Sequence, residues 1–153
     1  MRRFRSTLQA LLTVRQRQER LAMERYSEAL RARQKAVAAL AASDQERRLA
    51  GDVLNQRLST GVQAAEALSG QLHYRTLESR REAAQQALVT AENAIAPALQ
   101  AMLHAKNQRE AVEECIERQR ERHRRDQEYS ERKLLDELAQ RRTSPVRAFA
   151  GSD

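Results

Sequence analysis

Residues 58–78 read LSTGVQAAEALSGQLHYRTLE, and this stretch interrupts an otherwise uniform chain near its middle. It holds Gly61 and Gly70, which are two of the four glycines among the 153 residues. On both sides lie long segments of Ala, Leu, Gln, Arg and Glu that contain almost no turn residues. A single interruption between two such segments predicts the tip of a hairpin.

The turn chemistry of the stretch supports this interpretation. Ser59, Thr60 and Gly61 end the first segment, and Gln63 follows Thr60 by three residues, which is a capping-box pattern. Gly70 marks a second irregularity. We therefore expect a tip at residues 58–71 that contains a short helical piece over 62–69.

Composition sets the fold class to all-α. Aromatic residues make up 3% of the chain and charged residues 32%, and there is no Trp. Such a composition is typical of long helices or coiled coils, and β-branched residues are too scarce to build a sheet. Disorder is the competing interpretation because the chain is hydrophilic on average, but the regular spacing of apolar residues argues against it.

Both segments carry an apolar stripe at helical spacing. The first segment predicts a helix over residues 3–57. Leu12, Tyr26, Leu40 and Leu54 lie two heptads apart on one position of its stripe, and the charged residues Glu19, Arg33 and Arg47 alternate with them on that position. The second predicts a helix over residues 72–142, with one position occupied by Leu88, Ile95, Met102 and Ile116, and another by Ala84, Ala91, Ala98, Ala105 and Val112. Large residues at one position and alanine at the other favour close antiparallel packing.

The two stripes predict an antiparallel coiled-coil hairpin that forms one domain over residues 1–142. Closing it around the tip places four apolar pairs together, namely Leu54 with Leu77, Leu40 with Ala91, Tyr26 with Ala105, and Leu12 with Ile116. A parallel homodimer is the alternative arrangement. Residues 143–153 follow a Ser-Pro stop and are expected to be disordered.

Two features of the second helix carry further expectations. Pro97 lies inside the periodic pattern, which continues in phase across it, so we expect a kink without a break. Residues after about Glu128 have no partner in the hairpin and should project alone. There Leu134, Leu135 and Leu138 form an apolar patch that another protein could cover.

The sequence offers no catalytic or metal-binding constellation. Three histidines are scattered, the single Cys115 provides no ligand pair, and no glycine-rich phosphate loop occurs. We therefore expect no enzyme, no metal and no cofactor. One cysteine is compatible with a reducing compartment, and no stretch approaches the ~20 apolar residues of a membrane span. The start resembles a signal peptide but continues into a helical pattern, so we expect a cytoplasmic protein.

The formal net charge is +7, which makes a nucleic-acid-binding helix pair worth weighing. Arginines alternate with glutamates in the most charged stretch, and few aromatic side chains are available to stack on bases. No specific nucleic acid is therefore expected. A generic coiled-coil scaffold or adaptor is the principal alternative function.

The segment TGVQAAEALSGQLHYRTLESRREAA, the chain length and the basic ends resemble the central stalk proteins of type III secretion, the FliJ family of flagella and the YscO family of injectisomes. The resemblance implies a hairpin similar to the γ stalk of rotary ATPases. It implies insertion into a hexameric secretion ATPase, contact with the cytoplasmic domain of the export gate, and the ability to bind export chaperones. The place of action would be the cytoplasmic face of a bacterial secretion apparatus, of a flagellum or of a virulence system.

The resemblance also implies two sets of contact residues. The gate contact falls on His73, Tyr74, Leu77 and Arg80, which lie in the matching segment. The ATPase contact falls on the paired helix ends, with Arg2, Arg3, Phe4 and Leu8 from the first helix and Leu134, Leu135 and Leu138 from the second.

Overall fold

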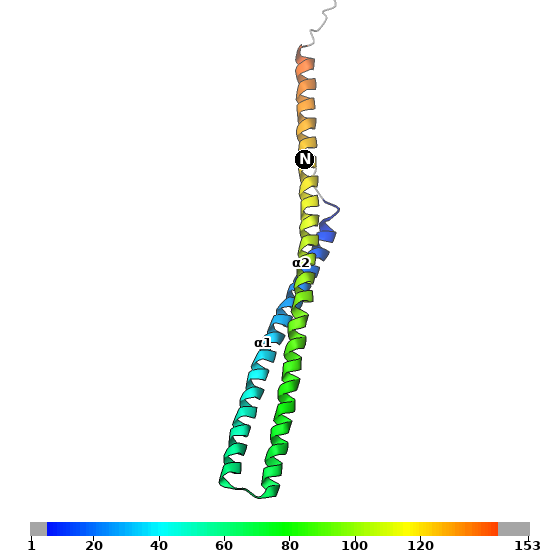
Figure 1. The fold of residues 1–153 in the computed structure, drawn as a ribbon. Helices are drawn as coiled ribbons and strands as arrows, with labels where there is room; N and C mark the ends of the chain where they lie inside the picture. The colour runs from blue at the N-terminus through cyan, green and yellow to red at the C-terminus, as the bar shows by residue number, and fades with distance from the viewer. Residues whose placement is uncertain (1–5, 144–153) are drawn as a thin grey trace, which may run out of the picture. The chain divides into compact units, whose positions relative to one another are not determined.

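The structure is a computed structural model that describes residues 6–143, and two long helices account for nearly all of them. Helix α1 spans Gln9–Thr60 and helix α2 spans Ala64–Thr143 (Figure 1). No strand occurs within residues 6–143. Ala, Leu, Gln, Arg and Glu lose little rotamer freedom in a helix, which explains why these segments stay helical over such lengths. The predicted all-α fold of two long paired helices is confirmed.

The chain divides into two compact units. The hairpin unit is Arg15–Asn107, and the terminal unit combines Met1–Val14 with Gln108–Asp153. Within the hairpin unit, α1 and α2 run antiparallel and are joined by one short turn (Figure 1). The assignment of residues 1–142 to a single domain stays a prediction. The predicted tail lies outside the described residues from position 144 onward.

Helix α1 begins later than predicted. The Ser6 Oγ accepts a hydrogen bond from the Leu8 amide at 3.1 Å, and the Gln9 amide donates to the Ser6 carbonyl at 3.4 Å. A serine that accepts from an amide two residues later is typical of a helix cap. The helix therefore starts at Gln9 and not at residue 3, and residues 3–5 lie outside the described part of the chain.

The turn at the hairpin tip is shorter than predicted. The hydroxyls of Ser59 and Thr60 both donate to the Gln56 carbonyl, at 2.8 and 3.1 Å, and so satisfy the last turn of α1. Gly61 follows with φ +87°, a left-handed conformation that glycine adopts without strain. The Gln63 carbonyl then accepts a hydrogen bond from the Ala67 amide at 3.0 Å in the first turn of α2.

The predicted tip at residues 58–71 is therefore wrong in its extent, because α2 starts at Ala64 and not at residue 72. The residues expected to form a separate helical piece are the first turns of α2. Gly70 lies inside the helix, where a Cβ would meet the Leu54 Cδ1 at 2.7 Å. The close approach of the two helices explains why glycine is present, at a cost of roughly 1 kcal/mol in helix propensity relative to alanine.

The helices of the hairpin unit bury the stripes that the sequence predicts. Leu77 and Ala105 are the most buried, with 4% and 9% of their surface exposed. Half-buried positions recur three and four apart along both helices, and those of α2 include Ala84, Leu88, Ala91, Ile95, Ala98 and Met102. Two helices cover only one face of each other, so this core is a narrow seam and not a layered interior.

The register of the seam differs from the predicted one by one heptad. Leu54 lies against Gly70, seven residues before its predicted partner Leu77. Other pairs agree with this register, since Arg33 pairs with Glu92 at 3.7 Å and Arg81 with Asp44 at 2.9 Å. The shorter turn causes the shift. Residues that were predicted to lie in the tip belong to α2 instead, so each residue of α1 lies opposite an earlier residue of α2 than predicted.

Helix α2 continues through Pro97 without interruption. Pro97 is exposed, so its ring faces away from the seam, whereas Ala98 and Leu99 beside it are half-buried. The absence of a break agrees with the periodic pattern across this position. A kink at Pro97 stays a prediction.

Candidate functional site

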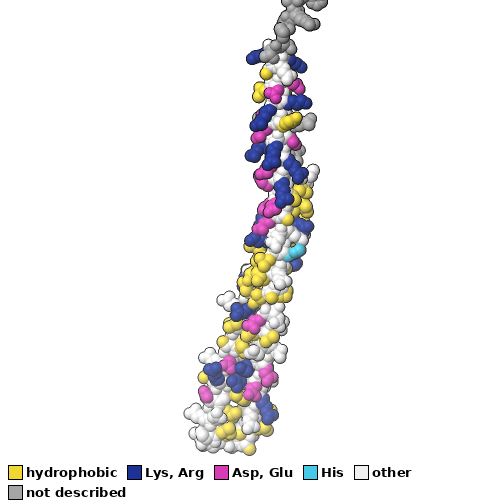
Figure 2. Space-filling view, turned by 45° about the horizontal axis from the view of Figure 1, so that its top comes forward, with side chains coloured by type: hydrophobic (Ala, Val, Ile, Leu, Met, Phe, Trp, Pro, Cys, Tyr) yellow, Lys and Arg dark blue, Asp and Glu magenta, His cyan; other side chains and the backbone are white. Residues whose placement is uncertain are grey.

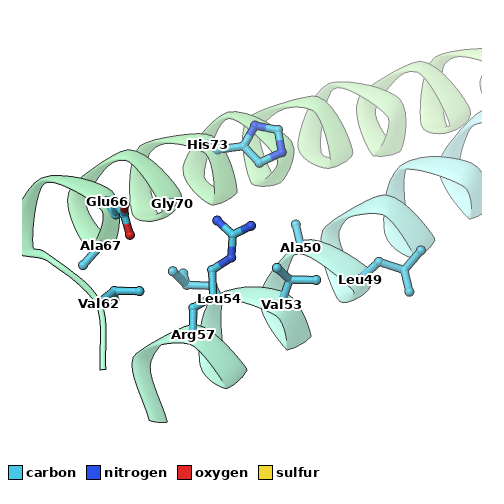
Figure 3. A pocket seen from close by; sticks show the side chains of 10 residues that line it. All are labelled: Leu49, Ala50, Val53, Leu54, Arg57, Val62, Glu66, Ala67, Gly70 and His73. Carbon is cyan, nitrogen blue, oxygen red and sulfur yellow. The ribbon is translucent and has the colours of Figure 1, made fainter. Parts of the chain in front are cut away.

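A pocket of about 350 Å³ lies between the two helices near the hairpin tip (Figure 3). The small residues Ala50, Ala67 and Gly70 leave room for it. Its other lining residues are Leu49, Val53, Leu54, Arg57, Val62, Glu66 and His73. The lining is thus mostly apolar, with the ionisable side chains Arg57, Glu66 and His73 around it, which is the usual character of a ligand-binding pocket.

The structure separates the four predicted gate residues into two pairs. Leu77 is buried in the seam, and Tyr74 lies against α1, where a Cβ added at Gly51 would come within 3.1 Å of the Tyr74 Cε2. His73 and Arg80, one heptad apart, are both exposed, and His73 lines the tip pocket. Of the four, only His73 and Arg80 therefore expose their side chains to solvent, whereas Leu77 and Tyr74 pack between the two helices, and the gate contact itself stays a prediction.

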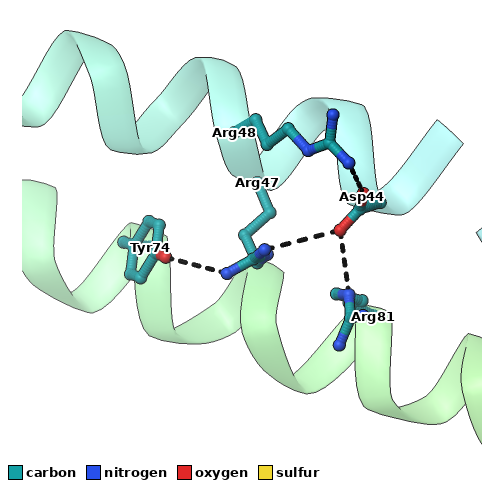
Figure 4. A network of polar contacts seen from close by, with 5 residues as sticks. All are labelled: Asp44, Arg47, Arg48, Tyr74 and Arg81. Atoms are coloured by element: carbon teal, nitrogen blue, oxygen red, sulfur yellow. Dashed lines mark hydrogen bonds and ion pairs between the residues drawn. The ribbon is translucent and has the colours of Figure 1, made fainter. Parts of the chain in front are cut away.

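A polar layer crosses the seam beside these residues, and it consists of Asp44, Arg47, Tyr74 and Arg81 (Figure 4). The Asp44 carboxylate accepts from Arg81 at 2.9 Å and from Arg47 at 3.4 Å. Arg47 also donates to the Tyr74 hydroxyl at 3.1 Å. The layer therefore links two residues of α1 with two residues of α2.

Asp44 and Arg47 of this layer shift each other's pKa values toward the ionised forms. The hydrogen bond from Arg81, with further contributions from Arg48 and Arg47, holds the pKa of Asp44 below its ordinary value of 3.8, although partial desolvation opposes this effect. Arg48 reaches the same carboxylate from the exposed side at 2.6 Å. Tyr74 and the Asp44 carboxylate raise the pKa of Arg47. The side chain of Arg47 therefore stays charged inside the seam.

The predicted ATPase end lies in the terminal unit. Leu8 is half-buried, and the neighbouring Ser6 hydroxyl donates to Gln119 Oε1 of α2 at 2.8 Å. Arg2, Arg3 and Phe4 lie outside the described residues. Leu134, Leu135 and Leu138 are 58%, 65% and 54% exposed.

The structure does not bring Leu8 together with the three leucines. Leu134 follows Gln119 by fifteen residues, which is roughly 22 Å along a helix axis. All residues from Glu128 to Arg142 are exposed, so this end of α2 has no intramolecular cover within the described chain. The expectation that α2 outruns its partner helix is confirmed.

The stretch of α2 before the leucines is charged on all sides. Arg118 pairs with Glu114 at 3.3 Å, and Arg125 pairs with Glu121 at 3.9 Å as the four-residue spacing predicts. Blue and magenta side chains accordingly alternate over the C-terminal part of α2 (Figure 2). Each such exposed pair contributes only a few tenths of a kcal/mol, and together they keep a helix without an apolar face ordered.

Sequence reasoning missed the residues that organise the tip. Gly70 was predicted only as an irregularity, and Gly51 lies inside the predicted first helix, whereas each receives a large side chain of the opposite helix, Leu54 and Tyr74 respectively. Arg47 falls on a heptad position otherwise held by Leu40 and Leu54. A charged residue on an apolar stripe is the signal that could have identified the polar layer.

Two further features of residues 6–143 bear on function. No group of three or more His, Cys, Asp or Glu side chains within them could hold a metal ion. None of their helices is long and apolar enough to cross a membrane.

Comparison with known proteins identifies the family. No curated protein and no solved structure matches the chain. A family model described as the flagellar FliJ protein matches residues 4–146. That match covers both helices, the hairpin tip and the exposed end of α2. The chain belongs to the FliJ family of flagellar proteins.

Proposed function

We propose that this chain is the central stalk of a flagellar or type III export apparatus, which couples a hexameric ATPase to the export gate. Membership of the FliJ family supports a role related to flagellar export. The observation that carries the finer proposal is the end of α2, where Leu134, Leu135 and Leu138 are exposed on a stretch that nothing within residues 6–143 covers.

The three leucines suit insertion into another protein. Residues spaced by one, three and four positions share one side of a helix, so Leu134, Leu135 and Leu138 form a continuous apolar patch. Arg132, Lys133, Arg141 and Arg142 flank them in sequence, and Asp136 and Glu137 lie between them, so basic residues outnumber acidic ones at this end. An apolar patch with basic neighbours fits an acidic, partly apolar central pore, where opposite charges steer the encounter and apolar burial supplies affinity.

The mechanism in this proposal is mechanical. A single two-helix hairpin lacks sixfold symmetry, so its insertion into a ring of six subunits engages some catalytic sites and not others. No residue of the chain performs chemistry. The chain acts in the cytoplasm at the face of the apparatus, and binding of export chaperones is a further part of the proposal.

The export gate is assigned to the hairpin tip. The exposed side chains of His73 and Arg80 make the contact, together with the tip pocket, while Tyr74 and Leu77 support it from within the seam. The two proposed partners thus use different units of the chain, the hairpin unit for the gate and the terminal unit for the ATPase.

The experiment measures stimulation of the purified cognate ATPase at moderate salt. Wild-type protein should bind the hexamer and raise its turnover. The variant Leu134→Ser/Leu135→Ser/Leu138→Ser should lose about tenfold in apparent affinity, because truncated apolar anchors dominate losses at interfaces. Circular dichroism should show that the variant remains helical, since more than half of the surface of each of the three side chains is exposed.

The chain provides a matched control. Leu68 and Leu72 of the hairpin unit are 58% and 54% exposed, the same fractions as Leu134 and Leu138. The variant Leu68→Ser/Leu72→Ser should stimulate the ATPase like wild type. The stalk proposal fails if wild-type protein neither binds nor stimulates the ATPase, or if both variants behave alike.

A further inference from the structure

The apolar seam of the hairpin unit is compatible with two registers. The observed register pairs Leu54 with Gly70. Moving α2 by one heptad along α1 would pair Leu54 with Leu77, Leu40 with Ala91 and Tyr26 with Ala105, which are apolar on both sides. Both stripes repeat every seven residues, so hydrophobic burial alone does not select one register over the other.

The polar layer is compatible with only one of the two. Arg81 follows Tyr74 by seven residues, so the slipped register would replace the Tyr74 hydroxyl beside Arg47 with a second guanidinium. Asp44 would lose Arg81 and face Leu88 instead. A like-charge pair in a narrow seam and the loss of the inter-helix partner of Asp44, which would keep only Arg47 and Arg48 of its own helix, both disfavour that arrangement.

The ion pair between Arg33 and Glu92 also favours the observed register. It joins α1 and α2 at 3.7 Å in the observed register. After a slip of one heptad, Leu99 would occupy the position of Glu92, and Arg33 would have an apolar side chain opposite it instead of a carboxylate. This pair is about half-exposed, so its contribution is small beside that of the polar layer.

The tip can supply the chain that a slip requires. The slipped register needs seven more residues in the turn, which would unwind residues 64–70 from the start of α2. That segment ends at Gly70, which is a poor helix former. The turn that precedes it begins at Gly61, which has a left-handed conformation. The unwound loop would thus run from one glycine to the other, and the segment 72–142 would remain helical.

We propose that the polar layer of Asp44, Arg47, Tyr74 and Arg81 selects the register of the hairpin and prevents a one-heptad slip. Its role is specificity between two packings of the same apolar stripes. A slip would move α2 by about 10 Å along α1 and dissolve the tip pocket, because Gly70 and Ala67 would leave the helix. The layer therefore determines whether the tip pocket forms.

The test reports the register by chemical cross-linking in a Cys115→Ser background. Arg33→Cys/Glu92→Cys reports the observed register, and Arg33→Cys/Leu99→Cys reports the slipped one. The two acceptor positions are about 10 Å apart along the helix, so a short, rigid bis-maleimide distinguishes them. With the polar layer intact, only the first pair should react efficiently.

The deciding variant is Asp44→Leu/Arg47→Leu, combined with each reporter pair. Replacing buried ionic groups by apolar ones preserves folding in known cases, so the variant should remain helical. We expect the reaction of the 33/99 pair to rise at least fivefold relative to the same pair with the layer intact. The control Glu28→Leu/Arg31→Leu removes one acidic and one basic side chain from the exposed face of α1, and its cross-linking should match the intact protein.

Three outcomes would overturn the proposal. If the variant remains helical and still reacts only through the 33/92 pair, the polar layer does not select the register, and the turn or the fit of Tyr74 and Leu54 against Gly51 and Gly70 does so instead. If the variant loses its helicity, the apolar stripes are insufficient for either register, and the layer is required for folding and not for selection. Equal slippage in the control would show that surface charge in general, and not this layer, determines the pairing.

Discussion

Three glycines within twenty residues of this chain have two different roles. Gly61 provides the only positive φ among residues 6–143, and a Cβ there would meet nothing within 4 Å. Gly51 and Gly70 have ordinary helical conformations, and each makes room for a side chain of the opposite helix. Backbone conformation therefore requires the first, and close helix packing requires the other two.

Asp44 makes stability depend on pH in the acidic range. Its pKa is held below 3.8 in the folded chain, chiefly by Arg81, so ionised Asp44 stabilises the fold at pH values above its unfolded pKa. This stabilisation is lost as the pH falls from about 3.8 through the lower folded value. We expect Asp44→Asn to be less stable than wild type between about pH 5 and pH 7, and the difference to shrink below about pH 4.

Urea unfolding followed by circular dichroism at several pH values measures this difference. Asp52→Asn, an exposed aspartate on the same helix, provides the comparison and should show a smaller effect at every pH. A wild-type advantage over Asp44→Asn that persists unchanged at the lowest pH would contradict the assignment.

At the scale of the element, α2 maintains one helix over residues of very different character. Its first part is covered by α1 in the hairpin unit, and its last part, from Glu128 to Arg142, is exposed throughout. Ion pairs four residues apart replace apolar burial in the charged stretch between them. Helix propensity and local charge pairing therefore sustain the end that we propose to enter the ATPase.

Pro97 is the residue of α2 that opposes the helix most strongly. It donates no backbone hydrogen bond and crowds the preceding turn, and its exposed position means that little packing depends on it. Pro97→Ala should raise the free energy of unfolding by about 1–3 kcal/mol. Thermal denaturation followed at 222 nm should show a higher midpoint, and an unchanged or lower midpoint would indicate that the proline relieves strain in the seam.

At the scale of the whole molecule, the seam residues of the hairpin unit pack against one another within one chain. Leu77 and Ala105 are buried without a second copy, which leaves the parallel homodimer no stripe to pair. We expect the free protein to be a monomer of 17.5 kDa. Light scattering coupled to size exclusion measures this mass at physiological salt.

The same measurement separates the stalk from the alternative function. A self-associating scaffold or adaptor should elute as a stable dimer or larger species. A mass twice that of the chain, persisting on dilution, would favour that alternative and would oppose the stalk proposal. The exposed leucines of α2 are too few to hold such a dimer by themselves, so a stable one would require an interface elsewhere.

Much of the candidate site was predictable because it depends on local pattern. The exposure of Leu134, Leu135 and Leu138 followed from the two helices having unequal lengths. The burial of Leu77 was predicted by its place on the apolar stripe, although its predicted partner Leu54 was wrong, yet the resemblance assigned it to a surface. Tyr74 was also assigned to a surface. The glycine opposite it and the arginine near it in space hold it in the seam, and linear spacing reveals neither of them.

The sequence by itself determined the all-α fold, the two helices, the existence of a hairpin and the faces that meet, because periodicity specifies which side of a helix is apolar. Only the tertiary structure decided the register, the three-residue turn and which tip side chains reach solvent. A stripe that repeats every seven residues looks the same after a slip of seven. Contacts between residues distant in the chain, such as Asp44 with Arg81 and Leu54 with Gly70, distinguish the two arrangements.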